Sequence, residues 1–316
     1  MKQTRREFVR TLFVATQATV LGSLVPREVF AADAKAGGLN FIVVGDWGRE
    51  GEKDQMDVAK QMGLAAEDMS ARFIIAAGDN FYESGVASVT DPQWQTSFEK
   101  VYTAPSLQVR WQAVLGNHDY HGSCEAQIEY GKVSSRWNMP ARYYTRTEQI
   151  DGAHAVDFFY LDTTPMAGFF GDELIFGHHV KDEDVPEQLK WLRSALAAST
   201  APWKIVVGHH PVYSGGEHGD TPYIIEHVLP LLQQYKVQAY INGHDHDLQH
   251  LQADTVNLFC SGGGSKIRPT RNTPHTKFAR SSSGFMAVAL QPERMEVRMI
   301  SDRGQLLYTT SVPRIS

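Results

Sequence analysis

Five short polar clusters, each directly after an apolar run, carry residues that could bind metal ions. They are Gly45-Asp46-Trp47-Gly48, Gly78-Asp79-Asn80-Phe81-Tyr82, Gly116-Asn117-His118-Asp119, Gly208-His209-His210-Pro211 and Gly243-His244-Asp245-His246. Carboxylate and amide oxygens suit hard cations, and imidazole nitrogens suit iron, zinc and related ions. Such groups gathered from five places predict a metal site, and their number indicates two ions.

The apolar runs before these clusters indicate how the side chains come together. The runs are Phe41–Val44, Phe73–Ala77, Ala113–Leu115, Ile205–Val207 and Ala239–Ile241. Short β-branched runs of this kind are typical of buried parallel strands. In α/β sheets, sites lie beyond the carboxyl ends of such strands. We therefore expect the polar clusters to meet at one edge.

Individual residues in the clusters suit different parts of such a centre. The carboxylate of Asp79 has two oxygens and can bridge two ions, whereas Asn117 offers a neutral oxygen. His244 and His246 are two residues apart on a tight turn and can point at different ions, and His209 completes the second. Each residue alone is more often structural, as a turn aspartate or a core histidine. The prediction depends on all five clusters in this order.

The rest of the chain alternates between strand and helix patterns. Helices are expected over 53–69, 91–101, 186–198 and 222–234, and strands within 137–161 and over 257–260, 285–290, 295–300 and 306–311. The stretch 163–184 has no clear period and is expected to be a loop, with His178 and His179 exposed to solvent. With 316 residues and 42% hydrophobic content, the chain can bury a large core.

Together the five clusters resemble the signature of the calcineurin-like metallophosphoesterases, and most closely the purple acid phosphatases of the tartrate-resistant type. The likeness extends to Arg136-Trp137-Asn138, Gly215–Gly219 and Ser261–Gly264. It implies an α/β fold of two mixed β-sheets that are packed together and flanked by helices, in one domain over residues 33–316. It also implies a binuclear metal centre at the strand ends.

The resemblance also implies the ligands of the two ions. It assigns Asp46, Tyr82 and His246 to a ferric ion, Asn117, His209 and His244 to a divalent ion (Fe²⁺, Zn²⁺ or Mn²⁺), and Asp79 to both. Many relatives carry a histidine where this chain has Gly48, so Tyr82 becomes the discriminating residue. A phenolate there would donate charge to ferric iron. The alternative, a core tyrosine beside Phe81, leaves one ion short of ligands.

The implied activity is hydrolysis of phosphate monoesters by a hydroxide formed at the metals. His118 and His218 match the positions of substrate-binding and acid residues, and either can protonate the leaving alcohol. Asp119 either orients His118 from behind or caps the turn. His210 stands where relatives often carry an aromatic residue, which alters the pocket.

Two other functions fit the same centre. One is a periplasmic phosphodiesterase or nucleotide hydrolase, which the sequence separates poorly from a monoesterase. The other is a non-catalytic binding protein, which would be expected to lose metal ligands, whereas none is missing here. The expected substrate is a phosphorylated small molecule or a phosphoprotein.

The first 32 residues have the pattern of a twin-arginine export signal. Arg5-Arg6 precedes an uncharged apolar stretch, and Phe30-Ala31-Ala32 offers a cleavage site. A membrane anchor is the alternative, but residues 11–25 are too few to span a bilayer. We therefore expect delivery by the twin-arginine machinery to the periplasm or beyond it, without a stable membrane anchor.

Charge and cysteine content restrict the chain further. Cleavage after residue 32 removes five basic and two acidic residues, so the formal charge changes from −6 to −9. An acidic protein of this kind is not expected to have nucleic acid as a structural partner. Cys124 and Cys260 are too few for a disulfide framework, and they form either one bridge or two separate buried thiols.

Overall fold

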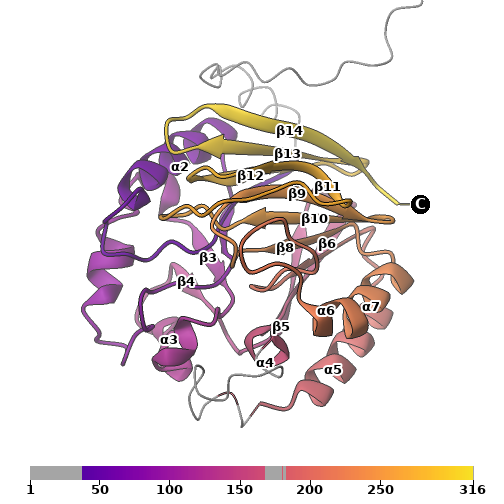
Figure 1. Ribbon diagram of the computed structural model, residues 1–316, viewed down its shortest axis with the longest axis horizontal. Coiled ribbons are helices and arrows are strands. Elements are labelled where there is room, and N and C mark those ends of the chain that lie inside the picture. Colours follow the sequence, from indigo (N-terminus) through magenta and orange to yellow (C-terminus); the bar gives the residue numbers. More distant parts are fainter. Residues whose placement is uncertain (1–37, 168–179, 181–182, 316) are drawn as a thin grey trace, which may run out of the picture.

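Two seven-stranded mixed sheets form the centre of the protein (Figure 1). The computed structural model describes residues 38–167, 180 and 183–315, so the expected export signal and His178-His179 lie outside the described residues. The first sheet has the order β14-β13-β12-β1-β2-β3-β4, and the second has the order β11-β9-β10-β8-β7-β6-β5. This confirms the predicted fold class.

The first sheet has a parallel half and an antiparallel half. Its strands are β1 (Leu39–Val44), β2 (Phe73–Ala76), β3 (Arg110–Ala113), β4 (Trp137–Asn138), β12 (Gly284–Leu290), β13 (Arg294–Ser301) and β14 (Leu306–Pro313). Strands β1 to β4 run parallel to one another, and β12 to β14 extend the sheet antiparallel from β1. Every residue of β1 and β2 is buried, as expected of strands covered on both faces.

The second sheet has a parallel core between antiparallel edges. Its strands are β5 (Tyr144–Gln149), β6 (Ala155–Tyr160), β7 (Trp203–Val207), β8 (Ala239–Asn242), β9 (Leu248–Ala253), β10 (Val256–Ser261) and β11 (Thr276–Arg280). Strands β6, β7, β8 and β10 are parallel. Strands β5, β9 and β11 pair antiparallel at the two edges.

Aromatic side chains join the inner faces of the two sheets. Phe41 and Phe73 of the first sheet stack at 5.0 Å between ring centroids. Phe158 of the second sheet meets both rings edge-on, at 5.5 and 5.6 Å. Edge-to-face contacts of this kind are favourable arrangements of aromatic rings. The sheets therefore share one apolar interior, above which their strand ends converge.

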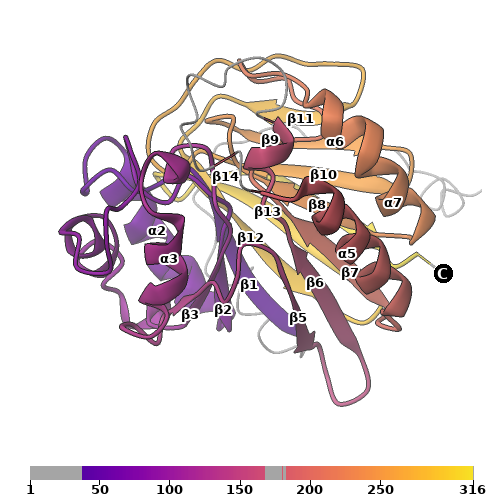
Figure 2. The same cartoon turned by 90° about the horizontal axis from the view of Figure 1, so that it is seen from below.

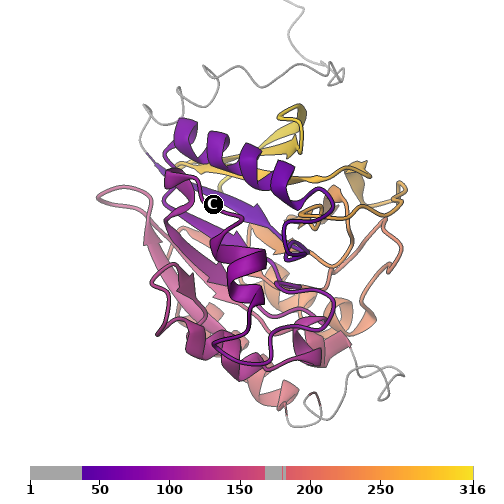
Figure 3. The ribbon, with the colours of Figure 1, turned by 90° about the vertical axis from the view of Figure 1, so that its left-hand side faces the viewer.

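Helices cover the outer faces. Helix α2 (Gln55–Met69) packs on β1 and β12 of the first sheet (Figure 3). On the second sheet lie α5 (Val185–Ala198), α6 (Pro222–His227) and α7 (Leu229–Gln234) (Figure 2). Two short helices, α3 (Cys124–Tyr130) and α4 (Thr164–Ala167), lie in the connections.

Some local expectations were wrong. The helix expected over 222–234 is two helices that meet at Val228, because Pro230 has no N–H to continue the first one. The helix expected over 91–101 is a six-residue π-helix, Trp94–Glu99. Helix α3 and strands β9 and β11 were not expected, and α4 lies in the stretch 163–184 that was expected to be a loop. The hydroxyl of Ser123 caps α3 by accepting the N–H of Ala126 at 3.1 Å.

Two further properties of the chain follow from the structure. Cys124 and Cys260 are both free and buried, so they are two separate thiols and not a bridge. Among the helices of the described residues, none combines the length and the apolar character needed to cross a membrane.

Candidate metal centre

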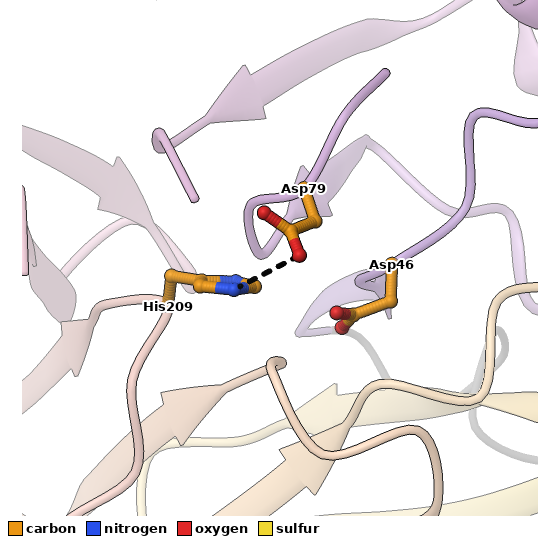
Figure 4. A group of neighbouring side chains, drawn as sticks. All are labelled: Asp46, Asp79 and His209. Atoms are coloured by element: carbon orange, nitrogen blue, oxygen red, sulfur yellow. Dashed lines mark ion pairs between the residues drawn. The ribbon is translucent and has the colours of Figure 1, made fainter. Parts of the chain in front are cut away.

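The predicted ligands come together where the parallel strands of both sheets end. Asp46 follows β1, Asp79 and Tyr82 follow β2, and Asn117 follows β3. On the other side, His209 follows β7, and His244 and His246 follow β8. Asp46, Asp79 and His209 point toward one another from these loops (Figure 4), and each offers an atom within 4.8 Å of the others.

The backbone turns sharply at several of these ligands. Asp46, Asp79 and His244 have φ values of 60°, 49° and 72°, in the left-handed region that Asp and His tolerate better than most residues. Gly78 has a φ of 87°, and a Cβ there would lie 2.5 Å from Nδ1 of His209. The first sheet can therefore approach His209 only through a glycine at this position.

Tyr82 lies at the centre of the predicted first-ion group. Its hydroxyl is 2.9 Å from Oδ1 of Asp46 and 2.9 Å from Oδ2 of Asp79. The Nε2 atom of His246 is 3.1 Å away from the same hydroxyl. A core tyrosine packed beside Phe81 would not need this position, so the geometry matches the predicted ligand set.

His209 lies at the centre of the second-ion group. Its Nε2 is 3.2 Å from Oδ1 of Asn117, 3.2 Å from Nδ1 of His244 and 3.4 Å from Oδ2 of Asp79. Its Nδ1 is 2.9 Å from the carbonyl oxygen of Ala77. A carbonyl only accepts, so Nδ1 carries a proton and a neutral His209 directs the Nε2 lone pair at the other ligands.

These donors fit metal ions. Asp46, Asp79 and His209 are all buried, and the lone pairs of oxygens and ring nitrogens converge on the same small volume. Converging acceptors repel one another in a buried site unless a proton or a cation lies between them. A set of hard oxygens with imidazole nitrogens is the set that iron, manganese and zinc bind. The residues thus form a suitable binuclear site.

In the absence of metal ions, protons balance the negative charge of the carboxylates in the centre. Burial opposes a charged imidazole at His209, but Asp79 and Asp46 outweigh burial and raise its pKa to about 10. Burial also opposes a charged Asp79, yet His209 and His118 bring the pKa of this carboxyl below its usual range. Binding of cations would displace the proton from His209, so metal binding should release protons.

The other two histidines of the predicted ligand set are already neutral. Burial lowers the pKa of His244 well below its ordinary value, and neighbouring imidazoles reinforce the effect. Burial, together with Arg268, lowers the pKa of His246 to about 3. Neutral imidazoles are the form that binds metal ions, so both rings are ready to coordinate at neutral pH.

His118 lies against the first-ion group. Its ring centroid is 4.4 Å from that of Tyr82, and its Nδ1 is 2.6 Å from the carbonyl oxygen of Glu83. Its backbone N–H donates to Oδ1 of Asp79 at 2.8 Å. Because Nδ1 is held by a carbonyl, the opposite nitrogen of the ring is left for a substrate.

His218 lies against the second-ion group. Its ring centroid is 4.2 Å from that of His244, and its backbone N–H donates to Oδ1 of Asp245 at 3.0 Å. Burial lowers the pKa of His218. The two predicted acid residues therefore lie on different sides of the centre.

Asp119 ties two loops together. Its carboxylate accepts the backbone N–H groups of Gly116 at 2.8 Å and of Asn80 at 3.1 Å, and the side-chain amide of Gln127 at 2.8 Å. Of the two roles considered from the sequence, the geometry matches the cap and not the orientation of the His118 ring, which is bonded to Glu83. Asp119 acts on the centre by holding the loops that carry Asp79 and Asn117.

Sequence reasoning missed several residues that contact the ligands. Arg49 stacks on the ring of Tyr82, and Ser265 donates to the carbonyl of Asp46. Thr163 accepts the backbone N–H of His209 and of His210, and its Oγ1 lies 3.0 Å from Nδ1 of His210. Only Arg49 carried a signal, since it directly follows the first polar cluster. His210 is buried, with its ring 4.4 Å from that of His244.

Comparisons with known proteins agree with this centre. Residues 39–248 match the family described as calcineurin-like phosphoesterase. Purple acid phosphatase 17 of Arabidopsis thaliana is 40% identical over 297 residues, which cover 88% of this chain and 86% of that protein. Tartrate-resistant acid phosphatase type 5 of Sus scrofa is 35% identical over 324 residues, which cover 96% of this chain and 95% of that protein.

A solved structure is also similar over most of its length. GAP50, described as the anchor in the inner membrane complex of Plasmodium, superposes with a TM-score of 0.79 at 26% identity, covering 89% of this chain and 90% of that one. The chain belongs to the calcineurin-like phosphoesterase family. Within that family it is a phosphoester hydrolase with a binuclear metal centre, as the sequence predicted.

Proposed function

We propose that the protein is a phosphomonoesterase of the purple type, with a ferric ion beside a divalent ion. The observation that carries this proposal is the Tyr82 hydroxyl within 2.9 to 3.1 Å of Asp46, Asp79 and His246. Burial and both carboxylates raise the pKa of this phenol, so its proton is lost only in exchange for a strong cation. Hard, charged oxygen ligands favour ferric over ferrous iron.

The ligand side chains prepare the reaction by placing their charges around the sites of the two ions. When bound, the two ions neutralise the phosphate and lower the pKa of water toward ~7 or below, which supplies a nucleophile at mild pH. Asp79 lies between the two groups of ligands and fixes their separation. The buried loops around Gly78 and Gly243 exclude bulk water from behind the centre.

Protonation of the leaving alcohol falls to the two histidines outside the ligand set. His118 reaches the centre over the Tyr82 ring and His218 over the His244 ring. A general acid must hold a proton within hydrogen-bond reach of the leaving oxygen. A substrate phosphate at the ions would lie between these two rings, so each imidazole is placed either to bind the phosphate or to protonate the alcohol.

Three measurements on the purified protein test the proposal. Metal analysis should find iron and a second metal in near-equal amounts, and the oxidised protein should absorb visible light through phenolate-to-iron charge transfer. Nitrophenyl phosphate should be hydrolysed much faster than bis-nitrophenyl phosphate. The reverse order would identify a diesterase, and absence of both activities in metal-replete protein would identify a binding protein.

We further propose export by the twin-arginine route to the periplasm or the outside of the cell. The support is the Arg5-Arg6 pair ahead of an uncharged apolar stretch. This route carries folded proteins, which agrees with a centre that is filled before export. Changing both arginines to lysine should keep the protein in the cytoplasm, and unimpaired export of that variant would refute the proposal.

A further inference from the structure

A partly buried arginine stacks on the tyrosine of the first-ion group. The guanidinium carbon of Arg49 lies 3.6 Å from the centroid of the Tyr82 ring. The side chain of Arg49 is only 10% exposed, so water screens its charge poorly. Contacts of this length between a guanidinium and an aromatic face are electrostatically attractive.

The position of Arg49 is fixed from several sides. Its Nε donates to Oγ of Ser265 at 3.1 Å, and the same hydroxyl donates to the carbonyl of Asp46. Its backbone N–H donates to Oε1 of Gln55 at 3.0 Å. A terminal nitrogen pairs with Glu83, whose side chain is 70% exposed. An ion pair with so exposed a partner contributes little, so the packed contacts hold the guanidinium on the ring.

Both negative and positive groups face Tyr82. Asp46 and Asp79 bond its hydroxyl and disfavour a phenolate, whereas Arg49 favours one. A phenolate between two carboxylates concentrates negative charge on one side of the centre. The guanidinium lies on the face of the ring, where it offsets this charge without occupying a ligand position.

We propose that Arg49 is a positioning residue that withdraws electron density from the Tyr82 phenolate and so tunes the ferric ion bound to it. The inference rests on the proposed function, because it requires a ferric ion on Tyr82. Two directions follow. The guanidinium lies directly on the ring, 3.6 Å from its centroid, whereas an ion would be held at the phenol oxygen, so the cation would lower the energy of the ring electrons more than that of the iron orbitals. It also disfavours the ferric state relative to the ferrous state.

Substitution of Arg49 separates charge from packing. Arg49→Gln should move the visible absorption band to longer wavelength and lower the reduction potential of the iron, with iron content unchanged. Arg49→Lys keeps the charge and should restore most of both values. Arg193→Gln, on the exposed side of α5, is the matched control and should change neither. Tyr82→Phe should lack the band altogether.

The possible failures are distinguishable. A coloured wild type whose band and potential do not move in Arg49→Gln overturns this inference and leaves the proposed function intact. Equal shifts in the Gln and Lys variants also overturn it, because they would show an effect of packing and not of charge. A colourless, active wild type overturns both. Iron loss in Arg49→Gln opposes the inference, because removal of a nearby positive charge is expected to leave iron content unchanged.

Discussion

The two sheets supply chemically different halves of the metal centre. Every predicted oxygen ligand, from Asp46, Asp79, Tyr82 and Asn117, follows a strand of the first sheet, β1, β2 or β3. Every predicted nitrogen ligand, from His209, His244 and His246, follows β7 or β8 of the second sheet. Anionic ligands thus face imidazoles across the junction of the sheets, and neither sheet holds a complete set for either ion.

The lack of predicted carboxylate ligands on the second sheet is not due to a lack of carboxylates there. It too has carboxylates just beyond its strands, at Asp162, Asp245 and Asp247. These carboxylates bond protein donors instead: Asp245 accepts from the backbone of His218, and Asp247 accepts from Gln249. Asp46 and Asp79 each accept one backbone N–H as well, but the other oxygen of each faces the Tyr82 hydroxyl. A carboxylate at a strand end can serve as a ligand where one of its oxygens is left for a metal.

The largest expected effect is that of removing the metals, because bound ions would be held by side chains from both sheets at once. Chelation should abolish activity and lower the melting temperature. A ligand present at about a thousand times its dissociation constant stabilises a protein by ~4 kcal/mol, so we expect a decrease of several degrees. Scanning calorimetry with and without chelator measures it. An unchanged melting temperature with the metals gone would mean that the sheets do not depend on the ions.

The next largest effect should come from Asp79, which is predicted to bridge the two ions. Asp79→Asn keeps the shape but removes the charge, so metal content and turnover should fall together, the latter more than about a hundredfold. Asp245→Asn is a comparison at a carboxylate that we place outside the ligand set, and it should retain both metals. Two metals per chain with near-normal turnover in Asp79→Asn would contradict the bridging assignment.

The two candidates for the general acid extend the comparison of the two sheets to the reaction itself. His118 follows the first sheet, and His218 follows the second. Changing the histidine that protonates the leaving group to Ala should lower the rate of hydrolysis of alkyl phosphates by about 10²- to 10⁴-fold. The cost should be smaller on nitrophenyl phosphate, whose leaving group needs no proton.

Kinetics on both substrate types, with metal content measured in each variant, assign the acid to one sheet. His227→Ala on α6 removes a half-exposed histidine and is the control. Equal losses on good and poor leaving groups in both variants would show that neither histidine is the acid.

Most of the predicted ligands were accessible to sequence reasoning because they lie within a few residues of a strand, whereas the role of Tyr82 was implied only by the family resemblance. A strand end fixes where such a residue lies, and the strand pattern is visible in the chain as an apolar run. The cap at Asp119 was less accessible, because its partners Asn80 and Gln127 come from a different loop and from helix α3. The stack of Arg49 on Tyr82 depends on Ser265, which is 216 residues away in the chain.

Local structure showed the same limit. The strands with both faces buried were predicted nearly to the residue, whereas the break at Val228 and the π-helix at Trp94–Glu99 were not. Hydrophobic periodicity does not distinguish a continuous helix from two short ones. Where a single proline or a single tertiary contact determines the local structure, a periodicity over many residues does not detect it.

The smallest expected effect concerns Asp162, a strand-end carboxylate of the second sheet that contrasts with Asp79 of the first. Its carboxylate is buried, accepts the hydroxyl of Tyr120, and lies 3.9 Å from Arg142. Burial raises the pKa of Asp162 to about 7, although the bond from Tyr120 and the charge of Arg142 oppose burial. The carboxyl of Asp79 has its pKa lowered instead, so Asp162 favours the protonated form and Asp79 the charged form.

The sign of the pH effect follows from comparing folded and unfolded chains at Asp162. An unfolded aspartate has a pKa near ~3.9, so between about pH 4 and pH 7 the folded protein holds a proton that the unfolded chain has lost. Stability from this group is therefore present at low pH and is lost as the pH rises toward 7. Asp162→Asn imitates the protonated form, and its stability relative to wild type should rise by about 2 kcal/mol from pH 5 to pH 7. Urea unfolding at fixed metal concentration across this range measures the difference. Parallel pH profiles for the two proteins would mean that Asp162 is charged throughout, and the contrast between the two strand-end carboxylates would fail.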